Sequence, residues 1–152
     1  MSSTATHADA ELILKLYDAR REAELRKARN WWVQTFWPQS ADDILAVMRA
    51  AGTLENNWFR QVLGYWGIAI SFVQHGVLNQ ALFLEQAFCG ELFFVYAKIA
   101  PYLKELREKT QNPNFLVNAE ALILSEAAKP RLEAVTRNVE NVRKARLQAK
   151  GN

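Results

Sequence analysis

Residues 54–75, LENNWFRQVLGYWGIAISFVQH, carry two adjacent apolar stripes at helical spacing and decide the fold. One stripe consists of Trp58, Val62, Tyr65, Ala69 and Phe72, and the other consists of Phe59, Leu63, Trp66, Ile70 and Val73. A helix that is apolar on more than one face is surrounded by other elements of the protein. The stretch therefore predicts a central helix that several other helices contact.

The segments beside this stretch predict how it begins, ends and pairs. Thr53 can cap the start of the helix, and Gly76 suits the left-handed conformation that often ends one. Asn79 can cap a second apolar helix over residues 80–100. We therefore expect residues 54–75 and 80–100 to form a central antiparallel hairpin.

Small residues at Gly64, Gly67 and Ser71 form a narrow row on the first of these helices. Each glycine costs a helix interior about 1 kcal/mol relative to alanine. A close approach by the backbone of another helix is a reason to keep such residues. We therefore expect a tight helix contact along this row.

Helical spacing continues through the rest of the chain, and no stretch shows the sustained alternation of a strand. Residues 9–37 form either one long bent helix or two helices that meet near residues 20–22. Pro101 either kinks the helix before it or begins a new one. The remaining predicted helices cover residues 41–51, 101–109, 114–128 and 130–148.

The chain is therefore predicted to be all-α, a compact bundle of about six helices. It is expected to form a single domain over residues 9–148, between flexible termini at residues 1–8 and 149–152. Its 152 residues are 50% hydrophobic with a net charge of +3, which excludes a disordered protein.

Membrane and compartment signals are weak. The uncharged residues 61–84 contain an apolar run only at 62–73, shorter than the roughly 20 residues that a transmembrane helix needs. We expect no transmembrane span, and the N-terminus lacks the pattern of a secretory signal. Cys89 is the single cysteine, so the chain forms no disulfide scaffold by itself and suits a reducing compartment. We therefore expect a cytoplasmic location.

The positive charge is concentrated at the C-terminus. Residues 129–152 contain seven Lys and Arg side chains and two Glu side chains, whereas the preceding residues are slightly acidic. Such a basic helix can contact nucleic acid or an anionic lipid. The candidate basic surface consists of Arg137, Arg143, Lys144 and Arg146. The alternative is a solvated helix whose cations interact favourably with its C-terminal dipole.

Motifs for catalysis, metal binding and nucleotide binding are missing from the sequence. His7 and His75 are the only histidines, and no ligand pair has the spacing of a zinc site. Cys89 follows Phe88 in an aromatic helix, which favours a buried packing thiol over a nucleophile. We therefore expect no metal, no cofactor and no enzymatic activity.

Arg60, Glu85 and Glu91 are candidate buried polar residues, because they lie in the apolar centre of the chain. A carboxylate that faces the core needs a cationic partner such as Arg60 or Lys98. It can then serve as an acid or a base. The alternative is that the two glutamates mark the solvated edge of their helix.

Two apolar groups are candidate interface residues. The first group ends the first helical region and consists of Trp31, Trp32 and Trp37. The second group has the narrow spacing of a contact between two helices and consists of Leu132, Val135, Val139 and Val142. The tryptophans either include exposed interface residues or cap the end of the bundle. The C-terminal seam contacts either the bundle itself or another chain.

Residues 64–122 follow a recognisable order of features. These are an apolar helix at 65–72, the turn His75-Gly76-Val77-Leu78, an aromatic helix at 83–96, Pro101, and then Arg107. This order resembles a family of uncharacterised bacterial helical proteins, a domain of unknown function. The resemblance implies a helical fold and brings no activity, substrate or catalytic residue.

Together these features favour a soluble module that associates with itself or with another protein. The first alternative is a helical bundle that binds a small apolar ligand between its central helices. The second alternative is contact with nucleic acid or anionic lipid through the basic C-terminal helix.

Overall fold

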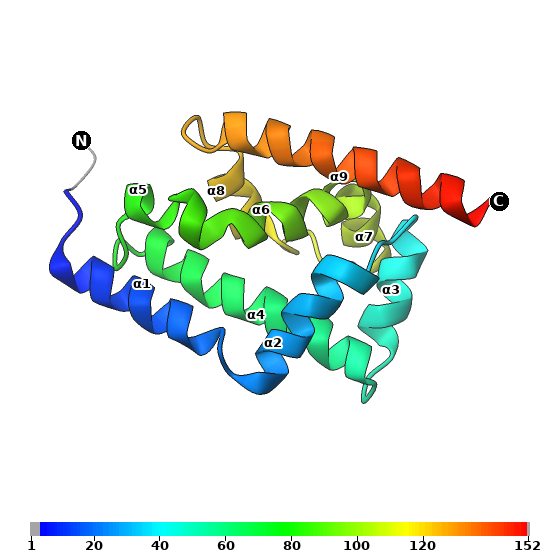
Figure 1. Ribbon diagram of the computed structural model, residues 1–152, viewed down its shortest axis with the longest axis horizontal. Helices are drawn as coiled ribbons and strands as arrows, with labels where there is room; N and C mark the ends of the chain where they lie inside the picture. The colour runs from blue at the N-terminus through cyan, green and yellow to red at the C-terminus, as the bar shows by residue number, and fades with distance from the viewer. Residues whose placement is uncertain (1–3, 152) are drawn as a thin grey trace.

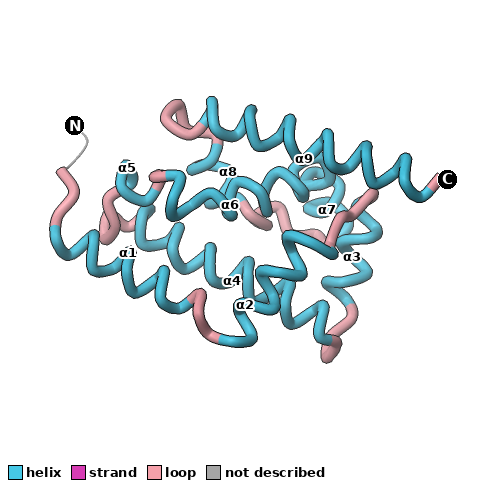
Figure 2. Tube along the Cα trace, in the orientation of Figure 1, coloured by secondary structure: helices cyan, strands magenta, loops and turns pink. Residues whose placement is uncertain are grey.

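The structure is a computed structural model of the chain, and it describes residues 4–151. Within this range the chain forms helices joined by short loops, and no strand is present (Figure 2). The helical elements are α1 (His7–Ala19), α2 (Ala23–Asn30), the π-helical turn η1 (Trp31–Thr35), α3 (Ala41–Arg49), α4 (Leu54–Gln74), α5 (Gln80–Phe83), α6 (Gln86–Ile99), the 3-10 turn η2 (Ala100–Tyr102), α7 (Leu103–Lys109), α8 (Val117–Ile123) and α9 (Lys129–Lys150). The all-α prediction is therefore confirmed for the described part of the chain.

The central helix is α4, as its two apolar stripes predict. Its start is capped by the Thr53 hydroxyl, which accepts a hydrogen bond of 3.2 Å from the Asn56 amide. Gly76 follows its end with a φ of +69°, a conformation that favours glycine. α2, α3 and α8 pack against α4, which crosses the middle of the molecule (Figure 1).

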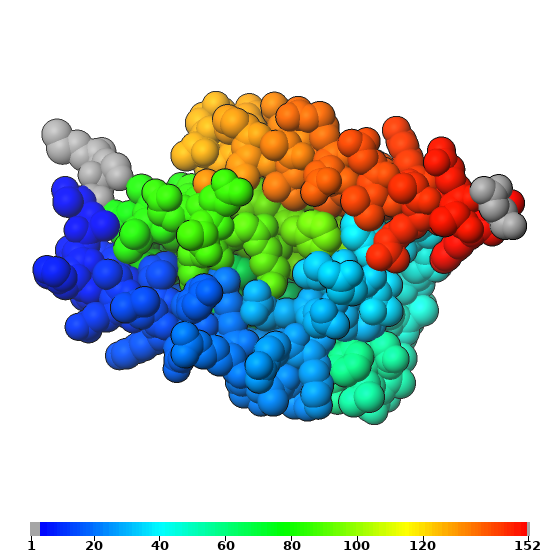
Figure 3. Space-filling model, viewed as in Figure 1, coloured from blue at the N-terminus to red at the C-terminus, as the bar shows by residue number. Residues whose placement is uncertain are grey.

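α6 runs in the opposite direction to α4 and lies between α4 and α9 (Figure 1). The rings of Trp66 on α4 and Phe88 on α6 lie 5.6 Å apart, so these two helices meet through large side chains. The backbones approach more closely between α4 and α2 and between α6 and α9. In the space-filling view, α9 covers the upper edge of the molecule (Figure 3).

The prediction of one helix over residues 80–100 is wrong, because the chain breaks between α5 and α6. At the break, Arg131 on α9 donates a hydrogen bond to the Leu84 carbonyl. The first helical region is also divided, since residues 20–22 separate α1 from α2, which was one of the two predicted alternatives. The described residues therefore form more helical segments than the roughly six predicted.

Two other boundaries differ from the sequence prediction. α8 begins at Val117 instead of near Asn114, because Leu116 precedes it in the left-handed conformation with a φ of +58°. α8 also ends at Ile123, well before residue 128. Pro101 lies within η2, which joins α6 to α7 without an open loop.

The termini are more helical than expected. α1 begins at His7, because Thr6 and Asp9 form a capping box in which each side chain accepts a hydrogen bond from the other residue's backbone amide. At the other end, α9 continues to Lys150. Residues 1–3 and 152 of the predicted flexible termini lie outside the described residues. Among residues 4–151, none of the helices combines the length and hydropathy that crossing a bilayer requires.

Candidate functional site

Trp31 and Trp32 lie in the core, so the prediction that they form an exposed interface is wrong. Their side chains are 7% and 0% exposed. The Trp32 ring stacks on Phe59 with centroids 5.1 Å apart, and the Trp31 ring stacks on Phe36 at 4.5 Å. Both indoles fit because the π-helical turn η1 packs against α4. Both tryptophans therefore belong to the hydrophobic core.

The apolar seam of α9 contacts α6 within the same chain. Val139 is completely buried, Leu132 and Val135 are half-buried against the core, and Val142 is also half-buried. The seam therefore contacts the bundle itself, which was one of its two predicted alternatives.

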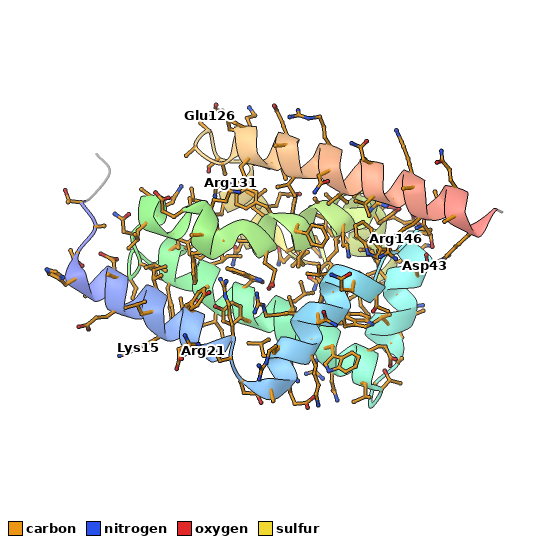
Figure 4. All side chains as sticks on the ribbon, in the orientation of Figure 1. Lys15, Arg21, Asp43, Glu126, Arg131 and Arg146 are labelled. Atoms are coloured by element: carbon orange, nitrogen blue, oxygen red, sulfur yellow. The ribbon has the colours of Figure 1, made fainter. Side chains whose placement is uncertain are left out.

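The basic surface predicted on α9 is smaller than its sequence suggests. Arg143 is 6% exposed, and its Nη2 atom donates a hydrogen bond of 3.2 Å to the Lys98 carbonyl. Arg146 donates a hydrogen bond of 2.8 Å to the Gln34 carbonyl and faces the rest of the bundle (Figure 4). Arg137, Lys144 and Arg146 remain exposed, and only Arg143 is buried. Two of the four predicted surface cations are thus engaged within the fold.

The candidate buried polar residues have different outcomes. Arg60 and Glu85 are exposed, so the prediction that they are buried is wrong. Glu85 faces solvent because it lies at the break between α5 and α6. The Glu91 side chain is 10% exposed, and its partners are Arg29 at 2.7 Å and the Trp66 indole nitrogen at 3.0 Å. Neither of the predicted cationic partners bonds to Glu91.

Lys98 is a buried cation that the sequence prediction named only as a partner. It is 0% exposed, and its Nζ atom donates hydrogen bonds to the carbonyls of Trp32 and, at 2.6 Å, Phe36. The same atom lies 3.8 Å from the centroid of the Trp37 ring. Burial, aided by the nearby guanidinium groups of Arg146 and Arg143, lowers the pKa of Lys98 to about 7. The apolar residues on both sides of Lys98 were the available sign of its burial.

Two further arginines, buried Arg20 and half-buried Arg131, also bond to backbone carbonyls. Arg20, which is 7% exposed, donates a hydrogen bond of 2.5 Å to the Phe88 carbonyl and one of 3.0 Å to the Tyr65 hydroxyl. Arg131 donates to the Leu84 carbonyl and points from α9 into the bundle (Figure 4). These contacts connect separate helices, and both arginines therefore have a structural role.

An apolar pocket of about 200 Å³ opens between α4, α6 and the start of α8, and we call it the α4–α6 pocket. It is lined by Leu63, Trp66, Gly67 and Ile70 of α4, by Leu92, Val95 and Tyr96 of α6, and by Asn114, Leu116, Val117, Asn118 and Ala119. None of these residues is charged. The sequence analysis considered a ligand between the central helices, but it did not identify any of these lining residues.

Gly67 forms part of the wall of the α4–α6 pocket. A methyl group added at Gly67 or Gly64 would meet no neighbouring helix or side chain within 4 Å. The expected tight helix contact along this row is therefore wrong. Gly67 borders the pocket, and Gly64 borders a separate open groove next to Ile68. The two glycines therefore mark the pocket and the groove, and they do not mark a place where another helix packs closely against α4.

The pocket contains one titratable side chain, Tyr96. Its hydroxyl donates a hydrogen bond of 3.3 Å to Glu120, which also pairs with Arg107 at 3.2 Å. Burial, with a further contribution from the Glu120 carboxylate, raises the pKa of Tyr96 to about 12. The hydroxyl therefore stays protonated at neutral pH, and the lining can offer a ligand apolar contact and neutral hydrogen bonds.

Other reactive groups lie elsewhere in the described part of the chain. No group of three or more His, Cys, Asp or Glu side chains there could hold a metal ion. Cys89 is buried, as predicted, and burial raises the pKa of its thiol. Its sulfur lies 3.1 Å from Arg131 Nη1, outside the α4–α6 pocket.

Comparisons with known proteins identify a family for most of the chain. Curated proteins and solved structures gave no match. Residues 5–125 match the family described as Domain of unknown function (DUF4760), a longer stretch than the residues 64–122 whose order suggested such a family. The match spans α1 to α8, including every residue that lines the α4–α6 pocket, and ends before α9. The chain therefore belongs to the DUF4760 family, a domain of unknown function.

Proposed function

We propose that this protein binds a small apolar molecule in the α4–α6 pocket. The observation that carries the proposal is a pocket of about 200 Å³ with an uncharged, mainly apolar lining between the central helices. An apolar cavity of about 150 Å³ is large enough to bind benzene. The pocket is therefore suited to a molecule somewhat larger than benzene, and it is too small for most drug-sized ligands.

Gly67 supports this proposal because it keeps the pocket open. Gly67 is exposed on α4 and lines the pocket without adding a side chain to it. A methyl group at position 67 would meet no neighbouring group within 4 Å, and alanine would favour the helix by about 1 kcal/mol. The chain thus leaves space where a larger residue would both fill the hollow and stabilise α4. A site that needs this space for a ligand accounts for both observations.

We propose binding instead of catalysis, because the pocket lacks an acid or base that titrates near neutral pH. Tyr96 is its one titratable residue, and Glu91 bonds to Arg29 and to the Trp66 indole nitrogen. General acid and base catalysis needs a group whose pKa lies near the working pH. The uncharged lining is suited to holding a molecule without changing it.

Isothermal titration calorimetry with 2-naphthol tests this proposal on the full chain. Gly67→Leu should fill the pocket and abolish binding, while circular dichroism shows an unchanged helix content. Gly64→Leu is the matched control, because it adds the same side chain to the same helix but faces the open groove. The proposal fails if the unaltered protein does not bind 2-naphthol, or if Gly67→Leu binds it as tightly as the unaltered protein does.

Mass spectrometry of the native protein provides a second test. Protein purified from its own cells should release a small apolar molecule on extraction, at close to one molecule per chain. The Gly67→Leu variant, purified in the same way, should release much less of it. Equal amounts from both proteins would contradict the proposed site.

Self-association is a second proposal, now at a different surface. The open groove between the α1–α2 junction and α4 contains Leu25, Gly64 and Ile68, and Ile68 is 56% exposed. Glu22 and Arg60 lie on the same groove, so a second copy of the chain could pair opposite charges there. Ile68→Arg should then shift the protein from dimer to monomer in light scattering, and a monomeric unaltered protein would contradict this proposal.

A further inference from the structure

We infer that the ligand of the α4–α6 pocket is an uncharged molecule with a flat, aromatic body and one neutral polar group. This inference rests on the proposed function and specifies its ligand class. It is carried by three features of the pocket: the lack of charge in its lining, the shape of its walls and the placement of its asparagines.

The lining favours an uncharged ligand. The carboxylates that contact the lining are already paired: Glu120 accepts a hydrogen bond from the Tyr96 hydroxyl and pairs with Arg107, and Glu91 accepts one from the Trp66 indole and pairs with Arg29. A charged ligand would lose its hydration without gaining a partner of opposite charge, which is costly in an apolar site. A ligand carboxylate would also lie close to the Glu120 carboxylate. The pocket should therefore exclude both anions and cations.

The walls favour a flat ring. Trp66 on α4 and Tyr96 on α6 supply aromatic faces or edges, which pack well against other aromatic rings. Gly67, also on the α4 side, presents bare backbone and adds no side chain to the wall. Since a cavity of about 150 Å³ accepts one benzene ring, a volume of about 200 Å³ suits a fused pair of rings or a ring with a short substituent.

The rim provides a place for one neutral polar group. Asn114 and Asn118 line the pocket and are exposed to solvent, so they lie at its opening. A carboxamide both donates and accepts hydrogen bonds, and it therefore suits a hydroxyl, a ring N–H or a carbonyl of the ligand. The apolar body would lie between α4 and α6, with its polar atom toward these two residues.

A matched series of naphthalene derivatives at pH 7 tests this inference. Calorimetry on the full chain would compare 2-naphthol, naphthalene, 2-naphthoate and 2-naphthylmethylamine, which share one ring system and differ in polarity and charge. We expect 2-naphthol to bind about fivefold more tightly than naphthalene, because it gains one neutral hydrogen bond. The anion and the cation should each bind at least about 100-fold more weakly than 2-naphthol.

Variants at the rim locate the polar contact. In Asn114→Ala with Asn118→Ala, the preference for 2-naphthol over naphthalene should disappear while naphthalene still binds. Gln111→Ala, on the loop outside the pocket, is the control and should leave that preference unchanged.

The outcomes separate this inference from the proposed function. If 2-naphthoate or the amine binds within tenfold of 2-naphthol, or if the rim variant keeps the full preference, the inference is overturned and binding in the pocket still stands. If neither naphthalene nor 2-naphthol binds the unaltered protein, the proposed function fails and the inference fails with it.

Discussion

The ammonium group of Lys98 on α6 donates a hydrogen bond of 2.6 Å to the carbonyl oxygen of Phe36, just after the π-helical turn η1. The same group also bonds to the Trp32 carbonyl, so one buried cation holds two carbonyls where the first helical region ends. A π-helical turn followed by extended chain frees carbonyls that the next turn of a helix would otherwise bond. Lys98 supplies their donors from a different helix and thereby fixes η1 against α6.

Lys98→Met should lower the free energy of unfolding by about 3 kcal/mol, because it leaves two buried carbonyls without a donor at about 1–3 kcal/mol each. Urea denaturation followed by circular dichroism measures the change. Lys104→Met is the control, since Lys104 is exposed on α7. A variant at position 98 that is as stable as this control would show that the two carbonyls find other donors.

The stability that depends on Lys98 should rise with pH. Burial, with the nearby Arg146 and Arg143, lowers the pKa of Lys98 to about 7 from an ordinary 10.5. Between these values the unfolded chain binds more protons than the folded chain, so the free energy of unfolding increases as the pH increases.

The measurement is the difference in unfolding free energy between the unaltered protein and Lys98→Met. It should be nearly constant below pH 7 and should grow from pH 7 to pH 9.5. Because both proteins share every other titrating group, their changes cancel in the difference. A difference that shrinks over this range would mean that the folded protein favours the charged form of Lys98.

Glu91→Gln should destabilise the protein by about 1–2 kcal/mol, because it removes a charged acceptor from two partly buried donors. The Glu91 carboxylate accepts hydrogen bonds from Arg29 at 2.7 Å and from the Trp66 indole at 3.0 Å. A double-mutant cycle with Arg29→Gln measures how much of this loss belongs to the ion pair. Additive effects of the two substitutions would contradict a direct interaction.

Gly67→Ala and Gly64→Ala should each raise the free energy of unfolding by about 1 kcal/mol, since the added methyl group meets no neighbour and alanine favours a helix. Gly76→Ala is the contrasting control. At a φ of +69° it should lower the stability by a similar amount, because that backbone conformation is strained for alanine. Thermal unfolding of the three variants measures these changes. A loss of stability in Gly67→Ala would indicate a close contact at that position.

The sequence predicted helices best where local signals were strong. α4 lies where its apolar stripes and its capping residue Thr53 place it, and α3 lies within the predicted residues 41–51. The break after α5 could not be predicted, because Arg131, which bonds to the Leu84 carbonyl, is distant in the chain. Such a tertiary hydrogen bond overrides a helical pattern that is continuous in the sequence.

The candidate sites were harder to predict than the helices. The aromatic count could not show that Trp31 and Trp32 face inward, because that depends on the wider turn of η1 and on its packing against α4. The charge of Arg143 likewise suggested a surface, whereas its contact with the Lys98 carbonyl is a property of the folded chain. Gly67 was the residue in the sequence that could have indicated the α4–α6 pocket. A row of glycines, however, is equally consistent with a tight helix contact and with an open pocket.

The position of α9 has a consequence for where this domain ends. The family match stops at residue 125, yet α9 begins at Lys129 and buries Val139 against the rest of the bundle. A boundary drawn from sequence similarity therefore passes through a packed interior. A protein cut at residue 125 would expose the apolar side of α6, and it should aggregate. Any relative that shares only the matched region needs another segment, or a neighbouring subunit, to shield the equivalent helix.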